Sequence, residues 1–290
     1  AVNVSVKKGN SPVPALTASD FRLFDNDVQQ EITAVSLDAV PVDVSFVVET
    51  SVKAFPHIDF ARDAIRGMVA FLRASDRLRV LTTGNAVVNV LPWRSASVPD
   101  TAAIQMNMGQ IALVADAVFM ALVHRPSPGR RHLVVALTEG HDWCSLISGN
   151  ALARAAERSG AVFHLVSMQP REALGTHQEQ NWPYGAHSFC RTQSSFVGDK
   201  VDMRPFLSDA ARLTGGMAHT AWYSFDRIAV DAFDRIFDDF RRSYVLHYVP
   251  RGVDRSGFHR LRDEMPAKGY TVRARPGYWG TSRTDAAPAR

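Results

Sequence analysis

Hydrophobic positions change their spacing twice along the chain and so divide it into three parts. In the first part, Val2, Val4 and Val6 alternate with polar residues, and further short runs of this kind extend to Leu37. Alternation with a period of two residues is typical of strands that bury one face. We therefore expect residues 1–38 to form a β segment.

The middle part alternates between two patterns. Residues 42–48 and 132–138 are almost continuously apolar, which is typical of strands buried on both faces. Stretches with apolar residues at helical spacing lie between such runs, at 56–73, 111–122, 151–158, 203–213 and 225–242. Strands that alternate with helices indicate βαβ units. For residues 39–243 we predict an α/β fold with a doubly wound, mostly parallel sheet.

The last part returns to strand patterns. Residues 244–249, 259–262 and 270–275 are short runs separated by turn residues. We expect residues 244–280 to pair with the N-terminal segment in one small β unit beside the α/β domain. Residues 281–290 are polar and rich in Ala and Pro, and we interpret them as a tail.

Composition excludes several classes of protein. Hydrophobic residues make up 46% of the 290 positions and charged residues 21%, which is ordinary for a globular protein. No run of about 18 apolar residues predicts a membrane span, and no signal peptide opens the sequence. The net charge is +4, but the basic residues are scattered. They do not form the basic, aromatic-interleaved run of a nucleic-acid groove, so we expect no nucleic-acid partner.

Catalytic motifs are absent from the sequence. It has no G-x-S-x-G elbow, no H-E-x-x-H and no phosphate loop. A zinc-dependent hydrolase would require His141, His177 and His187 to meet beside Glu139 or Asp142. We interpret these histidines as separate loop residues, and we predict that the protein is not an enzyme.

Five segments resemble a von Willebrand factor A-type domain. Residues 42–53 resemble its first strand and metal loop, where an apolar strand precedes Asp-x-Ser-x-Ser. Residues 132–142 resemble the later strand that ends Thr-Asp-Gly, and residues 213–216 resemble the Thr-Gly-Gly before the last strand. The flanks at 16–21 and 244–278 are similar to the acidobacterial-type von Willebrand A-related proteins. The resemblance implies a secreted, periplasmic or cell-surface binding protein.

The resemblance also implies a metal-ion-dependent adhesion site at the carboxyl ends of the strands. Such a site holds a divalent cation with Asp, Ser and Thr oxygens. The sequence retains Ser51 and departs elsewhere, with Glu49 for the first Asp, Lys53 for the second Ser, Ile111 or Ala112 for the loop Thr, and Glu139 for the later Asp. The metal site is therefore interpreted as degenerate.

Lys53 leads to a hypothesis about this site. An ammonium beside a divalent ion costs on the order of several kcal/mol at low effective dielectric. We expect Lys53 to replace the metal and to neutralise Glu49 and Glu139, so that no Mg²⁺, Ca²⁺ or other cofactor binds. Two alternatives stay open: Lys53 points to solvent, or a cation binds in an altered site with Asp142 or His141.

The two cysteines fall on the same rim. Cys144 follows the strand that ends at Thr138, and Cys190 lies in the long segment 169–200. Both connections leave the carboxyl ends of neighbouring strands, so we predict a Cys144–Cys190 disulfide, with two buried free thiols as the alternative. The chain-entropy model gives such a bridge about 4 kcal/mol of stabilisation, and it would imply an oxidising compartment.

The segment 169–200 also carries aromatic and histidine residues, namely His177, Trp182, Tyr184 and His187. Such residues suit a protein-binding surface, and they suit a self-packed cover over the site equally well. We predict a non-enzymatic protein-binding or adhesion module for an unidentified protein or extracellular ligand. Metal-dependent adhesion and a purely structural subunit are the alternatives.

Overall fold

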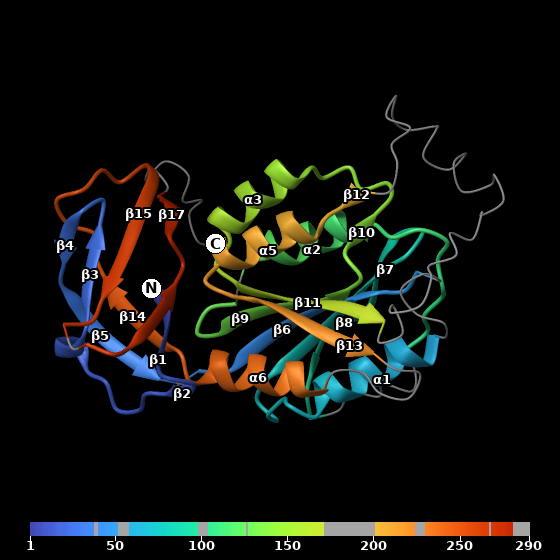
Figure 1. Cartoon of the computed structure of the whole chain (residues 1–290), viewed down its shortest axis with the longest axis horizontal. Coiled ribbons are helices and arrows are strands. Elements are labelled where there is room, and N and C mark those ends of the chain that lie inside the picture. The colour runs from blue at the N-terminus through green and yellow to red at the C-terminus, as the bar shows by residue number, and fades with distance from the viewer. Residues whose placement is uncertain are drawn as a thin grey trace.

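The computed structural model describes residues 1–37, 40–51, 58–97, 104–125, 127–170, 201–223, 230–266 and 268–280. These residues form an α/β domain with a β unit beside it (Figure 1). The predicted α/β class is confirmed, as is the small β unit built from the two ends of the chain. In the described part of the chain, no helix has the length and apolar character to cross a membrane.

A six-stranded sheet forms the centre of the α/β domain, in the order β13-β11-β9-β6-β7-β8. The strands are β6 (Val42–Glu49), β7 (Arg77–Thr83), β8 (Val87–Ser95), β9 (Arg131–Thr138), β11 (Val162–Pro170) and β13 (Ala218–Tyr223). All neighbours run parallel except the edge strand β8. Parallel neighbours are joined by crossovers, so helices cover both faces and the inner strands are buried. Every residue of β6 and β9 is buried, as their continuous apolar runs predict.

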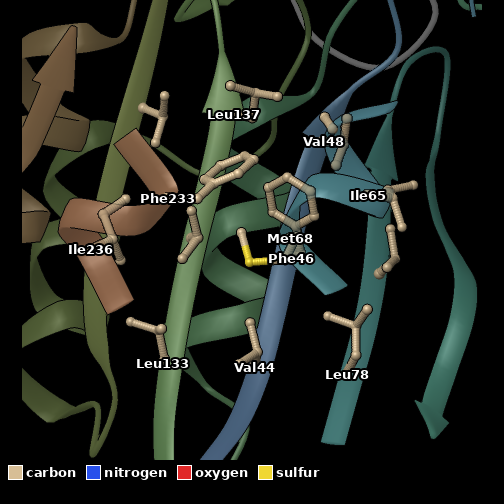
Figure 2. Packing of buried hydrophobic residues seen from close by; sticks show 14 of the residues in the cluster. Val44, Phe46, Val48, Ile65, Met68, Leu78, Leu133, Leu137, Phe233 and Ile236 are labelled. Atoms are coloured by element: carbon tan, nitrogen blue, oxygen red, sulfur yellow. The ribbon is translucent and has the colours of Figure 1, made fainter. Parts of the chain in front are cut away.

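Helices cover the two faces of this sheet (Figure 1). They are α1 (Ile58–Val69) and α6 (Val230–Arg241) on one face, and α2 (Val114–Leu122), α3 (Gly149–Arg158) and α5 (Arg204–Leu213) on the other. Figure 2 shows Phe46 of β6 grouped with Met68 of α1 and Phe233 of α6. The Phe46 and Phe233 rings meet edge to face, with 5.5 Å between their centroids.

The helix predicted over 111–122 begins later than expected, at Val114. Leu113 has φ −113° and ψ 61°, which is not helical, and its amide donates to Thr83 Oγ1 at 2.8 Å. Residues 111–113 are therefore tied to the end of β7 instead of forming a first helical turn.

Strands from both ends of the chain form the β unit as two sheets. One has the order β16-β1-β14-β5 with β2 beside β1, and the other has β17-β15-β3-β4. Their bounds are β1 (Val2–Lys8), β2 (Ser11–Pro12), β3 (Arg22–Asp25), β4 (Val28–Gln30), β5 (Ile32–Leu37), β14 (Tyr244–Tyr248), β15 (Gly257–Glu264), β16 (Thr271–Ala274) and β17 (Gly277–Gly280), with a 3-10 helix at Ala18–Asp20. Val4, Leu23 and Tyr244 are fully buried members of its core.

Asp239 of α6 joins the β unit to the α/β domain. Its carboxylate accepts from Ser5 Oγ at 2.8 Å, pairs with Lys7 Nζ at 3.0 Å and accepts from Arg273. Because these three partners come from β1 and β16, both ends of the chain are anchored to the same helix.

Two glycines end α5 and start the approach to β13. Gly215 has φ +83°, which fits the glycine stop that the sequence predicts. Gly216 lies so close to β11 that a Cβ there would be 1.7 Å from the carbonyl oxygen of Phe163. The Thr-Gly-Gly motif thus permits a close backbone approach.

Candidate functional site

Glu49 is the centre of the polar group at the carboxyl edge of the sheet. It is the last residue of β6, and its side chain is only 2% exposed. The carboxylate accepts from Ser51 Oγ at 2.6 Å, from Thr138 Oγ1 at 2.6 Å and from the amide of Glu139 at 3.0 Å. Both hydroxyl groups therefore donate to Glu49. We call Glu49, Ser51 and Thr138 the carboxyl-edge network.

Burial changes the acidity of this network. It raises the pKa of Glu49 to about 7, and the charge of Glu139 acts in the same direction. The hydrogen bonds from Ser51 and Thr138 favour the ionised form and oppose that rise. At neutral pH, Glu49 therefore exchanges between its protonated and ionised forms.

We expect the free energy of unfolding to fall as the pH rises from about 4.5 to about 7. The folded-state pKa of Glu49 is about 7 and its ordinary value is 4.5, so the folded state binds this proton more tightly than the unfolded state. Stability is highest below the ordinary value and is lost as Glu49 ionises in the folded protein. At about 1.4 kcal/mol per pKa unit, the whole difference corresponds to about 3.5 kcal/mol, of which about 2–3 kcal/mol is lost between pH 5 and pH 8.

Urea unfolding at pH 5 and pH 8 measures this effect, with Glu49→Gln as the control. The variant cannot ionise, so its drop in stability between the two pH values should be smaller than that of the wild type by the same amount. An equal drop in both proteins would show that Glu49 does not titrate in this range.

Asp142 belongs to a separate arrangement that we call the α2 clamp, formed by Asp142, Ser145 and Asp116. Asp142 accepts from the amide of Ala115 at 2.9 Å and from Ser145 through its amide at 2.9 Å and its Oγ at 2.7 Å. Asp116 accepts in return from the amide of Ile147 at 2.9 Å. A carboxylate is stabilised at a helix N-terminus by the free amides and the helix dipole, so Asp142 holds the loop after β9 against α2.

The two residues predicted to stand in place of a metal-binding threonine are apolar, and both are buried. Ala112 is fully buried in the core on the α2 face, and Ile111 is almost fully buried. Two hydroxyls that the sequence analysis did not single out lie nearby in the fold, on Thr83 and Thr138. Each is the last residue of its strand, and that position at the end of an apolar run is the signal that could have identified them.

Glu139, His141, Asp202 and Arg204 form the more accessible part of this edge, which we call the polar rim. His141 Nδ1 lies 3.8 Å from Glu139 Oε2. The short strands β10 (His141–Asp142) and β12 (Val201–Asp202) pair antiparallel and place His141 opposite Asp202. Arg204 pairs with Asp202 at 2.7 Å and lowers the pKa of that carboxyl to about 2. The rim thus presents both signs of charge.

Several predicted site residues lie outside the described part of the chain. They are Lys53, His177, Trp182, Tyr184, His187 and Cys190. The replacement of a metal by Lys53, the Cys144–Cys190 disulfide and the aromatic loop therefore remain predictions. Among the residues that the structure does describe, no three His, Cys, Asp or Glu side chains are grouped as metal ligands.

In the comparisons with known proteins, several solved structures are similar to this chain. No protein-family model matches the chain, and no curated protein matches it. It is similar to the solved structure of BatB from Bacteroides thetaiotaomicron, with 14% identity over 68% of this chain and 96% of that one and a TM-score of 0.42.

Two further structures have names that refer to von Willebrand factor A features. One is a von Willebrand factor type A protein from Catenulispora acidiphila, with 13% identity over 79% of this chain and 50% of that one and a TM-score of 0.39. The other is proximal thread matrix protein 1 from the mussel byssus with a zinc-occupied MIDAS motif, with 12% identity over 75% and 50% and a TM-score of 0.46. The fold assignment rests on the strand order and register given above.

Proposed function

We propose that the chain is a non-enzymatic protein-binding module that uses the carboxyl edge of its central sheet and holds no divalent cation there. The carboxyl-edge network is the observation that supports this most directly. The hydroxyls of Ser51 and Thr138 donate to the buried carboxylate of Glu49. With the amide of Glu139, they occupy both carboxylate oxygens with protein donors, so a divalent cation would have to displace these hydrogen bonds to reach Glu49.

The proton bound by Glu49 adds a second reason. A pKa near 7 means that a cation would have to compete with a proton for this carboxylate. The neighbouring loop contributes the methyl group of Ala112 in place of an oxygen, and the oxygens of Asp142 are engaged in the α2 clamp. The proposal includes Lys53 as the charge that replaces the metal.

A partner would meet the polar rim. Asp202 and Arg204 are well exposed, and Glu139 and His141 are partly so. A rim with both signs of charge favours orientation and selectivity in protein recognition more than raw affinity. Together with the resemblance to von Willebrand A-type domains, this favours a protein ligand at an extracytoplasmic location.

The test of cation independence is a calorimetric titration with Mg²⁺ and Ca²⁺. We expect no binding at millimolar concentrations, and partner binding that is unchanged in EDTA and lost when Glu139→Arg and Arg204→Glu are combined. Millimolar or tighter cation binding that disappears in Glu49→Ala would overturn the proposal.

Lys53→Ser is the matched variant for this experiment. It removes the ammonium and restores the hydroxyl that a metal loop would have. Divalent binding in Lys53→Ser, with none in the wild type, is the result expected if Lys53 keeps the cation out. Absence of binding in both proteins would contradict that role for Lys53.

A further inference from the structure

A groove of about 410 Å³ lies between the end of α2 and α3. Its floor is apolar and includes Phe119, Leu122 and Ala155. Ser159 and Gly160, which also line it, come just before β11. The groove is therefore at the amino edge of the sheet, at the opposite end of the strands from the carboxyl-edge network. Its volume is in the range of sites for small organic molecules.

Three arginines, Arg125, Arg154 and Arg158, surround this floor. All three are exposed, and none forms an ion pair within the described ranges. Elsewhere, the exposed helical arginines Arg66 and Arg212 pair with Asp63 at 2.7 Å and with Asp209 at 2.6 Å. The groove therefore combines an apolar floor with positive charge that no carboxylate compensates.

His124 lines the groove, and its ring contacts a buried polar cluster formed by Trp93, His132 and Arg79. The His124 ring lies 5.2 Å from the Trp93 ring and 5.6 Å from the His132 ring, measured between centroids. Arg79 is only 8% exposed, and its guanidinium carbon lies 5.0 Å from the centre of the Trp93 ring. The His124 and Trp93 rings thus lie between the groove and a buried guanidinium.

Hydrogen bonding within this cluster leaves donors without acceptors. Arg79 donates to Ser45 Oγ at 2.9 Å, and Ser45 Oγ and His132 Nε2 share a further hydrogen bond at 2.9 Å. The Arg79 Nε and Trp93 Nε1 donors are buried with no acceptor in the part of the chain that is described, and His132 Nδ1 is buried there with no hydrogen-bond partner. These residues do not line the groove, but the contact between the His124 and Trp93 rings lets Trp93 fluorescence report a ligand bound at His124.

We propose that this groove binds a small organic carboxylate, with its apolar body against the floor and its carboxylate toward His124 and the surrounding arginines. The two halves of the proposal have separate evidence. The apolar floor and the volume of the groove select the apolar body of the ligand, and the three lining arginines, which have no ion pair in the described ranges, select the anion.

Octanoate is the probe for this site. 1-Octanol is the control that keeps the apolar chain without the charge, and inorganic phosphate is the control that is an anion without the chain. In calorimetric titrations of the full chain, we expect octanoate to bind at least about tenfold more tightly than either. Octanoate binding should also change the fluorescence of the wild type and not that of Trp93→Phe. Equal binding of octanoate and 1-octanol, or of octanoate and phosphate, would overturn the proposal.

Exposed arginines provide variants that leave the core intact. We expect Arg125→Gln combined with Arg154→Gln to weaken octanoate binding about tenfold or more, while Arg66→Gln and Arg212→Gln leave it unchanged. Ala151→Trp narrows the groove from α3 and should abolish binding while the far-UV circular dichroism is retained. Unchanged affinity in both the double variant and Ala151→Trp would show that octanoate binds elsewhere.

Discussion

Replacement of Gly216 by alanine is expected to destabilise the protein by more than about 3 kcal/mol, because the added Cβ would clash with the backbone of β11. A Cβ at this position would lie 1.7 Å from the carbonyl oxygen and 2.6 Å from the carbonyl carbon of Phe163. Phe163 lies in the interior of β11 and its side chain is fully buried. Its backbone is fixed by pairing with β9 on one side, and β11 pairs with β13 on the other.

The measurement is urea unfolding of Gly216→Ala beside Gly67→Ala. Gly67 lies within α1, and a Cβ there would be 3.8 Å from the nearest atom of Phe233, which is ordinary contact. Alanine is favoured over glycine inside a helix by about 1 kcal/mol, so this control should be as stable as the wild type or slightly more so. A Gly216→Ala protein within about 1 kcal/mol of the wild type would show that β13 can move away from β11.

The second large effect is expected for Asp142→Ala in the α2 clamp. Asp142 is 4% exposed, and its loss leaves the amides of Ala115 and Ser145 without their acceptor. An unsatisfied buried donor costs about 1–3 kcal/mol, so the free energy of unfolding should fall by about 3 kcal/mol. Amide hydrogen exchange at Ala115 and Ser145 should accelerate by the same mechanism.

Asp202→Ala is the control for this second experiment. Asp202 pairs with Arg204 at 2.7 Å, but both side chains are well exposed, and exposed pairs contribute about 0–1 kcal/mol. If Asp142→Ala were no more destabilising than Asp202→Ala, the loop after β9 would not depend on the clamp.

Much of the fold could be predicted from the spacing of apolar residues. The continuous runs identified β6 and β9 because a strand with helices on both faces has no solvent side to mark with polar residues. Strand β17 was missed, since Gly277–Gly280 begins and ends with glycine and carries only two side chains between. The short strands β10 and β12 were missed because two residues carry no periodicity.

The candidate site was predictable only in part. The sequence placed Glu49 and Glu139 at neighbouring strand ends, and the structure brings them together, although Glu139 contacts Glu49 through its amide. The position of Asp142 in the sequence could not show that its carboxylate accepts from an amide at the N-terminus of α2 instead of facing a metal site. That choice depends on distances between atoms in the folded chain. The buried nitrogen atoms of Arg79, Trp93 and His132 come from three strands that only the sheet order brings together.

The pairing of β1 with β14 and β16 has a consequence for synthesis of the chain on the ribosome. Translation delivers β1 to β5 first, and β1 can pair with β2, and β3 with β4, at once. Their other partners, β14, β15 and β16, emerge only after the α/β domain has been made. The N-terminal strands must therefore keep unpaired edges while the α/β domain is being made, a state that invites misassociation. We infer that the central sheet is completed first, and that arrival of the last strands then closes the β unit around the waiting N-terminal ones.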